Sequence, residues 1–389
     1  MIYLDHNATS PLRAEVREAV ECALGIGGNA SSVHERGRTA RAVVEHARAQ
    51  VAALAGARIE DVIFTSGGSE ANALALWGAV TGAAGDGARI TRLFVSAIEH
   101  ESVLASAAAL TERVAGLRHE TVPVTGDGIA DLEALRTMLR EGKGRALIAL
   151  MAANNETGVV QPIAEVTELA RGADALLFVD SVQAAGKIAV PSADYVSLSA
   201  HKIGGPQGIG ALILREGAPF AAQILGGGQE RGRRAGTENL SGIAGFGAAS
   251  EIAARELSAA NRIAVLRDRF EDGLKRMVPD TVVFGPRAPR LANTSNFALP
   301  GLSAETALMA LDLDGVMLSS GAACSSGKVK PSHVLAAMGV GEDLSRCALR
   351  ASFGWNSTEA DVDAALLSIS RLLARIHGRV QPGHPRVAA

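Results

Sequence analysis

The sequence has little cysteine and no long apolar run. Its three cysteines, Cys22, Cys324 and Cys347, lie far apart and form no CxxC pair, so neither a disulfide framework nor a zinc site is indicated. No apolar run approaches the roughly 18 residues that a membrane-spanning helix needs. Asp5 and His6 interrupt the N-terminus too early for a secretory signal. We therefore expect a cytoplasmic protein with no bound metal and no membrane contact.

An excess of charge of one sign is also lacking. The chain has 38 Lys and Arg against 41 Asp and Glu, which gives a formal net charge of −3. This balance gives no general case for binding nucleic acid. With 389 residues, 48% of them hydrophobic, the chain is long enough for one large domain and a smaller second one.

Short apolar runs alternate with helical patterns along the chain. Helices are expected over 14–24 and 34–55, with Cys22 packed as a small core residue in the first. Strands are expected at 62–65, 93–96, 146–151, 176–180, 195–199 and 210–214. This alternation predicts an α/β fold with right-handed crossovers and a mostly parallel sheet covered on both faces. Such sheets bind ligands beyond the carboxyl ends of their strands.

Lys202 follows one of these strands and enters a glycine-rich turn. An amine is nucleophilic only when it is unprotonated, and burial at a strand end lowers the pKa of a lysine from about 10.4. We interpret Lys202 as an amine that bonds covalently to a cofactor aldehyde. On the tetrapeptide 199–202 alone, a solvated lysine leaving a strand is the commoner alternative.

Polar groups follow three further strands. The strand 62–65 runs into a Ser-Gly-Gly-Ser-Glu stretch, where bare amides at a helix N-terminus favour a phosphate. A plain helix cap formed by Ser69 is the alternative. Asp180 ends an apolar strand, where an acid is costly without a cationic partner such as a pyridinium N–H. His100 lies near the same edge of the sheet, although a lone histidine is more often structural.

Two glycine-rich patterns known from nucleotide-binding proteins do not fit this chain. No G-x-G-x-x-G follows the first strand. The stretch 321–328 is similar to a P-loop, but it has one spacer too many, and Val329 stands where a metal-binding Ser or Thr is needed. A dinucleotide fold and ATP chemistry are therefore disfavoured.

Five motifs occur in the order typical of one enzyme family. They are Ser66-Gly67-Gly68-Ser69-Glu70-Ala71-Asn72, Asn154-Asn155-Glu156-Thr157-Gly158, Asp180-Ser181-Val182-Gln183, Ser199-Ala200-His201-Lys202 with the following Gly205-Pro206-Gln207-Gly208, and Arg233-Arg234-Ala235-Gly236-Thr237. This set resembles the NifS/IscS-type cysteine desulfurases, which are class V, fold type I enzymes that use pyridoxal 5′-phosphate. The resemblance runs from 4–9 to 348–353 and so covers nearly the whole chain.

The resemblance implies a division into domains. A large cofactor domain at 11–260 would be built around a mostly parallel, seven-stranded sheet. A smaller α+β domain would combine 1–10 with 261–376 and would carry the catalytic cysteine. A flexible tail would follow at 377–389, where the composition also disfavours packing.

The resemblance also implies a role for each residue at a matching position. Lys202 would hold the cofactor and move the substrate α-proton, Asp180 would pair with the ring nitrogen, and His100 would stack on the ring. Arg350 would bind the substrate carboxylate, which its planar fork suits, although a surface salt bridge is the alternative. The remaining ligands would be Gly68, Ser69, Asn155, Gln183, Ser199, His201 and, across a homodimer, Thr237; Asn155 would also contact the substrate.

Cys324 decides the reaction that the resemblance implies. It lies in the small, polar stretch 319–327, where a buried structural thiol would be out of place, and an exposed thiolate is the nucleophilic form. The enzyme would convert L-cysteine to L-alanine and keep the sulfur on Cys324 as a persulfide. An acceptor such as an iron–sulfur scaffold would then take the sulfur. Cys347, in contrast, is expected to be inert core.

Three alternatives remain open. A selenocysteine lyase would use the same cofactor site without depending on Cys324. Another class V enzyme, such as an aminotransferase, would have no use for this cysteine. An inactive assembly scaffold would be expected to lose Lys202 or Cys324, and both are present. Acceptors in general cluster assembly, nitrogenase maturation and tRNA thiolation all fit the sequence.

Overall fold

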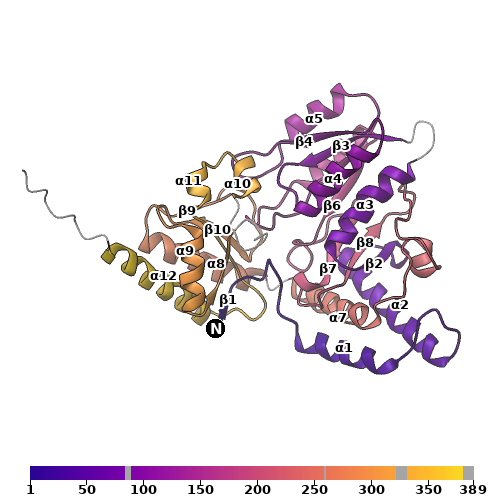
Figure 1. Cartoon of the computed structure of the whole chain (residues 1–389), viewed down its shortest axis with the longest axis horizontal. Coiled ribbons are helices and arrows are strands. Elements are labelled where there is room, and N and C mark those ends of the chain that lie inside the picture. Colours follow the sequence, from indigo (N-terminus) through magenta and orange to yellow (C-terminus); the bar gives the residue numbers. More distant parts are fainter. Residues whose placement is uncertain (84–88, 258–259, 321–330, 380–389) are drawn as a thin grey trace, which may run out of the picture.

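The two larger sheets of the described chain lie on opposite sides of the molecule, and a third sheet is a single pair of strands (Figure 1). The computed structural model describes residues 1–83, 89–257, 260–320 and 331–379. The larger sheet has seven strands in the order β2-β8-β7-β6-β5-β3-β4, and β8 runs antiparallel to both of its neighbours. These strands are β2 (Val62–Thr65), β3 (Ile90–Ser96), β4 (Arg118–Val122), β5 (Arg145–Ala149), β6 (Leu176–Asp180), β7 (Tyr195–Ser199) and β8 (Gly210–Leu214). The predicted α/β fold with a mostly parallel sheet is confirmed.

Helices cover both faces of this sheet. Successive residues of a strand point to opposite sides, so each face of the sheet has apolar side chains that a helix can bury. On β2, Phe64 packs against Phe246 of α7, whereas Ile63 belongs to the core under α3 and α4. The helices are α1 (Ala14–Ile26), α2 (Glu35–Ala55), α3 (Gly68–Gly82), α4 (Glu101–Arg113), α5 (Leu132–Glu141), α6 (Ile163–Gly172) and α7 (Leu240–Glu256), with short 3₁₀ turns η1 (Ile59–Asp61), η2 (Ala200–Lys202) and η3 (Gln229–Gly232). Among the described residues, no helix is long and apolar enough to cross a membrane.

Two details of this part of the chain differ from the sequence predictions. Cys22 was expected in the core, but its side chain is exposed. Its neighbour Ala23 lies on the buried face of α1. Because successive residues of a helix point in different directions, the side chain of Cys22 points toward solvent. The strand β4 was not predicted, because its sequence Arg-His-Glu-Thr-Val is polar and forms an edge of the sheet.

The smaller sheet is antiparallel, and the N-terminal segment joins it through an isolated bridge between Asp5 and Ser352. Its order is β12-β13-β10-β9, and a separate pair joins β1 to β11 in parallel. Leu4, which follows β1, is fully buried in the same core as Phe270, Phe297 and Phe353. The elements are β1 (Ile2–Tyr3), α8 (Ala260–Met277), β9 (Val282–Val283), β10 (Thr294–Ala298), α9 (Ala304–Leu313), β11 (Val316–Met317), β12 (Ser319–Ser320), α10 (His333–Ala337), α11 (Glu342–Ser345), β13 (Ala348–Ser352) and α12 (Glu359–Arg379).

The separate cores lead us to propose a domain boundary near residue 260, between α7 and α8. The N-terminal segment then belongs to the smaller domain, and Cys347 is buried there as expected. The proposed tail begins later than the sequence suggested, because α12 continues to Arg379. Residues 380–389 lie outside the described part of the chain.

Candidate active site

A cavity of about 660 Å³ lies between the two sheets, at the carboxyl ends of several strands of the larger one. The predicted site residues Gly68, Ser69, His100, Asn155, Asp180, Gln183, Ser199, His201, Lys202 and Arg350 all line it. Most follow β2, β3, β5, β6 or β7, and Arg350 comes from β13 of the smaller sheet. The topology of a parallel sheet therefore brings together residues that are far apart in the sequence.

Lys202 stands at the end of η2, directly after β7, and its side chain is half-buried. Its amine donates hydrogen bonds to the carbonyl oxygens of Asn7 (2.6 Å) and Ala8 (2.8 Å). Burial, together with the nearby charge of Arg350, lowers the pKa of Lys202 to about 8. A substantial fraction of this amine is thus unprotonated near neutral pH.

The N-terminus of α3 forms one wall of the cavity. The helix begins at Gly68, and its N-cap Gly67 has φ +154° and provides no side-chain bond to the helix. The alternative in which Ser69 caps this helix is wrong, because Ser69 already lies inside it. A Cβ atom on Gly68 would stand 2.9 Å from Val182 Cγ2, so glycine keeps this corner open. Such an uncapped N-terminus is suited to an anion.

Asp180 places a buried carboxylate at the end of β6. Its Oδ2 accepts a hydrogen bond from Asn72 Nδ2 at 2.8 Å, and its Oδ1 accepts one from the amide of Val182 at 2.9 Å. Both donors are neutral, so the negative charge can still pair with a cation that enters the cavity. Asn72 was present in a motif but was not predicted as a site residue.

Arg350 reaches the cavity from β13 and is only 5% exposed. Its Nη2 pairs with Asp5 Oδ1 at 2.6 Å, and its Nη1 donates to the carbonyl oxygen of Asn155 at 3.0 Å. Its Nε is buried and has no partner among the described residues. The alternative of a surface salt bridge is therefore wrong. The arginine keeps donor capacity for an incoming carboxylate, and Asp5 is a site residue that the sequence prediction missed.

Two histidines flank the cavity in different surroundings. His100 is the N-cap of α4, where its Nδ1 accepts from the amide of Ser102 at 3.2 Å, and its exposed ring lines the cavity. His201 lies 3.1 Å from Thr9 through Nδ1 and Oγ1. Burial, together with the charge of Lys202, lowers the pKa of His201 to about 4, so its ring is neutral at physiological pH.

The two remaining predicted residues are Thr237 and Cys324. Thr237 is exposed and lines a separate, smaller cavity with Phe64 and Gly208. Cys324 lies outside the described residues. After the undescribed residues, the chain resumes at residue 331. The hydroxyl of Ser332 there donates a hydrogen bond to Glu156 Oε2 at 2.5 Å. Burial raises the pKa of Glu156 to about 7.

Asn7 is a third site residue that the sequence did not reveal, after Asn72 and Asp5. It is 1% exposed, and its carbonyl oxygen accepts from both Gln183 Nε2 (2.9 Å) and Lys202 Nζ (2.6 Å). Its side chain donates to Thr294 Oγ1 at 2.9 Å. In the sequence, Asn7 is recognisable only as part of an N-terminal turn. No local pattern indicates that this turn packs against the end of β7.

The chain matches the family model described as aminotransferase class-V over residues 2–365. The cysteine desulfurase IscS of Dictyoglomus turgidum is 39% identical, over 96% of this chain and 95% of that protein. A cysteine desulfurase of Cereibacter sphaeroides is 43% identical, over 94% of both chains. The X-ray structure of a NifS-like protein from Rickettsia africae superposes with a TM-score of 0.86 at 33% identity, covering 96% of this chain and 99% of that one.

Proposed function

Because the chain belongs to the class V aminotransferase family and is an enzyme that depends on pyridoxal 5′-phosphate, we propose that it is a cysteine desulfurase. The proposed reaction converts L-cysteine to L-alanine. The carbon–sulfur bond of the substrate breaks and a sulfur–sulfur bond forms on Cys324, which becomes a persulfide; the proton balance is closed because alanine gains one hydrogen at its β-carbon. The observation that carries this proposal is the placement of Lys202, Asp180 and Arg350 around one cavity.

The cavity fits the cofactor. The space beside Gly68, which a Cβ atom would fill, and the uncapped start of α3 suit a phosphate, with Ser69, Ser199 and His201 as further ligands. Asp180 would pair with the ring nitrogen, His100 would pack on the ring, and Gln183 would bind the ring hydroxyl, beside Asn155. When bound, the cofactor supplies an electron sink for negative charge at the substrate α-carbon.

The side chains of this protein would do the remaining work. Lys202, with its lowered pKa, would take the α-proton and return it. Arg350 would bind the substrate carboxylate through its fork and its free Nε, and this would hold the α-carbon near Lys202. The thiolate of Cys324 would attack the substrate sulfur.

Three further points belong to the proposal. Thr237 is exposed on one chain, which is consistent with a homodimer in which it completes the neighbouring cofactor site. The persulfide would pass to an acceptor protein such as an iron–sulfur scaffold. We place the enzyme in the cytoplasm, because a thiol that works as nucleophile and carrier needs a reducing compartment.

The proposal is tested by the products. We expect the enzyme, given L-cysteine and a reducing thiol, to release alanine and sulfide in equal amounts without an added keto acid. Amino-acid analysis and a sulfide assay measure both. Pyruvate in place of alanine, or turnover that requires a keto acid, would contradict the proposal and favour another class V reaction. Turnover with L-selenocysteine alone would favour the lyase.

The lowered pKa of Lys202 leads to a pH prediction. Only the neutral amine reacts with the cofactor aldehyde, and it predominates above the folded-state pKa of about 8. Cofactor loading of the stripped enzyme should therefore rise between pH 6 and 8 and level off above, whereas an ordinary lysine would level off only above about 10.4. At pH 7 the neutral fraction should exceed that of an ordinary lysine by about 200-fold.

The measurement is the rate at which the cofactor absorbance of the enzyme develops after mixing, as a function of pH. Because the charge of Arg350 lowers the pKa of Lys202, the variant Arg350→Met should shift the midpoint to higher pH. A midpoint near 10 in the unaltered enzyme would contradict the prediction.

Arg350→Lys should weaken substrate binding. Lysine keeps the charge but loses the planar fork that matches a carboxylate, so kcat/KM for L-cysteine should fall about 10- to 100-fold, mainly through KM. Steady-state kinetics measure the change. Arg346→Lys is the matched control, because Arg346 is exposed on the surface and should give unchanged kinetics. An unchanged KM in Arg350→Lys would remove Arg350 from substrate binding.

A further inference from the structure

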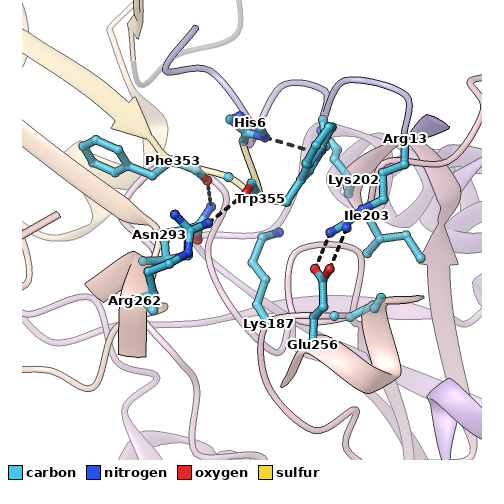
Figure 2. A pocket seen from close by; sticks show the side chains of 17 residues that line it. His6, Arg13, Lys187, Lys202, Ile203, Glu256, Arg262, Asn293, Phe353 and Trp355 are labelled. Atoms are coloured by element: carbon cyan, nitrogen blue, oxygen red, sulfur yellow. Dashed lines mark hydrogen bonds and ion pairs between the residues drawn. The ribbon is translucent and has the colours of Figure 1, made fainter. Parts of the chain in front are cut away.

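A second cavity, of about 390 Å³, lies behind Lys202 and is shown in Figure 2. We call it the rear cavity. His6 and Arg13 line it from the N-terminal segment, Lys187 from the turn after β6, Arg262 from α8, and Trp355 from the segment after β13. It shares Lys202 with the active-site cavity, and none of the roles proposed above uses it.

Basic side chains outnumber acidic ones around the rear cavity. The basic residues are Arg13, Lys187, Lys202 and Arg262, and the acidic one is Glu256. Arg13 already holds Glu256 through two hydrogen bonds of 2.9 and 2.6 Å. The charges of Lys187 and Arg262 therefore remain uncompensated by this acid.

The hydrogen bonds of Lys187 and Arg262 go to neutral acceptors. Arg262 donates to the carbonyl oxygens of Ser357 and Trp355, each at 2.8 Å. Lys187 donates to the carbonyl oxygen of Gln183 at 3.0 Å and to its Oε1 at 3.2 Å. In Figure 2 the Lys187 side chain points into the middle of the cavity, between Arg262 and the Arg13–Glu256 pair. An ammonium group so placed favours an anion beside it.

Two residues that line the rear cavity, His6 and Arg13, differ in how their nitrogen atoms are paired. His6 is 2% exposed, and its Nδ1 lies 3.0 Å from Ser10 Oγ. The His6 side chain also has a hydrogen bond with the side chain of Asn356, whereas Arg13 Nε is buried and makes no hydrogen bond within the described part of the chain. Buried polar groups are rarely left unpaired, so Arg13 Nε indicates a missing ligand. When Nδ1 of His6 accepts from Ser10, its Nε2 carries the proton and can donate.

We propose that the rear cavity binds a compact oxyanion of the carboxylate or phosphate class. Lys187 and Arg262 supply its charge-assisted bonds, and Arg13 Nε supplies a further donor. This ligand is additional to the cofactor and the substrate of the proposed reaction, so the inference goes beyond that function.

The position of Lys187 connects the proposed ligand to the active site. Burial, together with the charge of Lys202, lowers the pKa of Lys187 to about 7, and a bound anion would favour the ammonium form. That form donates to Gln183, and both Gln183 and Lys202 donate to the carbonyl oxygen of Asn7. The rear cavity is thus linked to the catalytic amine through Gln183 and Asn7.

The test uses Trp355, since the chain has only one other tryptophan, Trp77 on α3. In the cofactor-loaded Trp77→Phe enzyme, sodium acetate and inorganic phosphate are titrated separately at constant ionic strength. We expect a saturable change of Trp355 fluorescence with at least one probe. Saturation with acetate identifies a carboxylate site, and saturation with phosphate identifies a phosphate site.

Second substitutions in the same background locate the anion. Lys187→Met and Arg262→Gln should each weaken the apparent affinity at least about tenfold. Lys143→Met, at an exposed lysine, and Arg350→Lys, in the active-site cavity, should leave it unchanged. The cofactor absorbance reports that each variant is folded, and Arg262→Gln retains the test should Lys187→Met fail to fold.

Two results would overturn the inference. One is the absence of a saturable response to either probe. The other is an affinity that Lys187→Met or Arg262→Gln leaves unaltered while Arg350→Lys abolishes it, since the anion would then bind in the active-site cavity. The measurement needs no turnover, so its failure would not bear on the proposed desulfurase reaction.

Discussion

Replacing Cys324 with alanine should lower the turnover of L-cysteine by at least about 1,000-fold while the cofactor remains bound. In the proposed reaction Cys324 is the group that accepts the sulfur, and no hydroxyl or methyl group can form the sulfur–sulfur bond. Lys202, Asp180 and the start of α3 are untouched by this change, so the cofactor absorbance should persist. Alanine and sulfide release, measured beside the visible spectrum, separate the two effects.

The matched control for this variant is Cys22→Ala. Cys22 is an exposed, free thiol on α1 and does not line the active-site cavity, so its removal should leave turnover unaltered. In a single turnover, mass spectrometry should find one added sulfur on the peptide that contains Cys324. Equal rates for the Cys324→Ala enzyme and the unaltered enzyme would leave a lyase that does not depend on this residue.

Replacing Lys202 with alanine should have the larger effect, a loss of at least about 10⁴-fold in kcat. The amine would both hold the cofactor and carry the α-proton, so the variant loses covalent attachment and proton transfer together. Cofactor bound to the variant should be removed by gel filtration after borohydride treatment, whereas in the unaltered enzyme borohydride should fix it to the chain. Turnover assays and the spectrum of the desalted protein measure both expectations.

Lys143→Ala is the control for the Lys202 variant, because Lys143 is exposed on the surface. It should retain both the fixed cofactor and full turnover. If the Lys202→Ala enzyme kept cofactor after borohydride treatment, another lysine would be the attachment site. Lys187, which shares the rear cavity with Lys202 and has a pKa lowered to about 7, would then be the first to examine.

The sequence predicted the part of the site that depends on strand topology. Asp180 ends β6 and Lys202 follows β7, and these neighbouring parallel strands must end at the same edge of the sheet. A short apolar run followed by a polar residue is therefore enough to place both side chains. The motifs added the start of α3 in the same way, since it follows β2 directly.

The contacts that the sequence did not predict join distant segments. Asp5 forms an ion pair with Arg350, and the carbonyl oxygen of Asn7 accepts a hydrogen bond from the Lys202 amine. Neither Asp5 nor Asn7 lies in a periodic pattern that would indicate its partner. The burial of Cys22 was predicted wrongly for another reason. The helix was right, but Ala23 rather than Cys22 lies on its buried face, and an alanine-rich pattern determines the orientation of a helix poorly.

The pairing of the N-terminal segment with β13 sets the order of events during synthesis. The amide of Asn7 donates to Ser352 Oγ, across 345 residues of chain. At about 5–20 residues per second, a ribosome needs roughly 20 to 70 s to travel that length. During this time the larger sheet can fold, but β13 is not yet present to hold the N-terminal segment. The carbonyl oxygens of this segment accept the hydrogen bonds of the Lys202 amine. A nascent chain can thus contain every proposed cofactor ligand of the larger domain and still be inactive until its last strand leaves the ribosome.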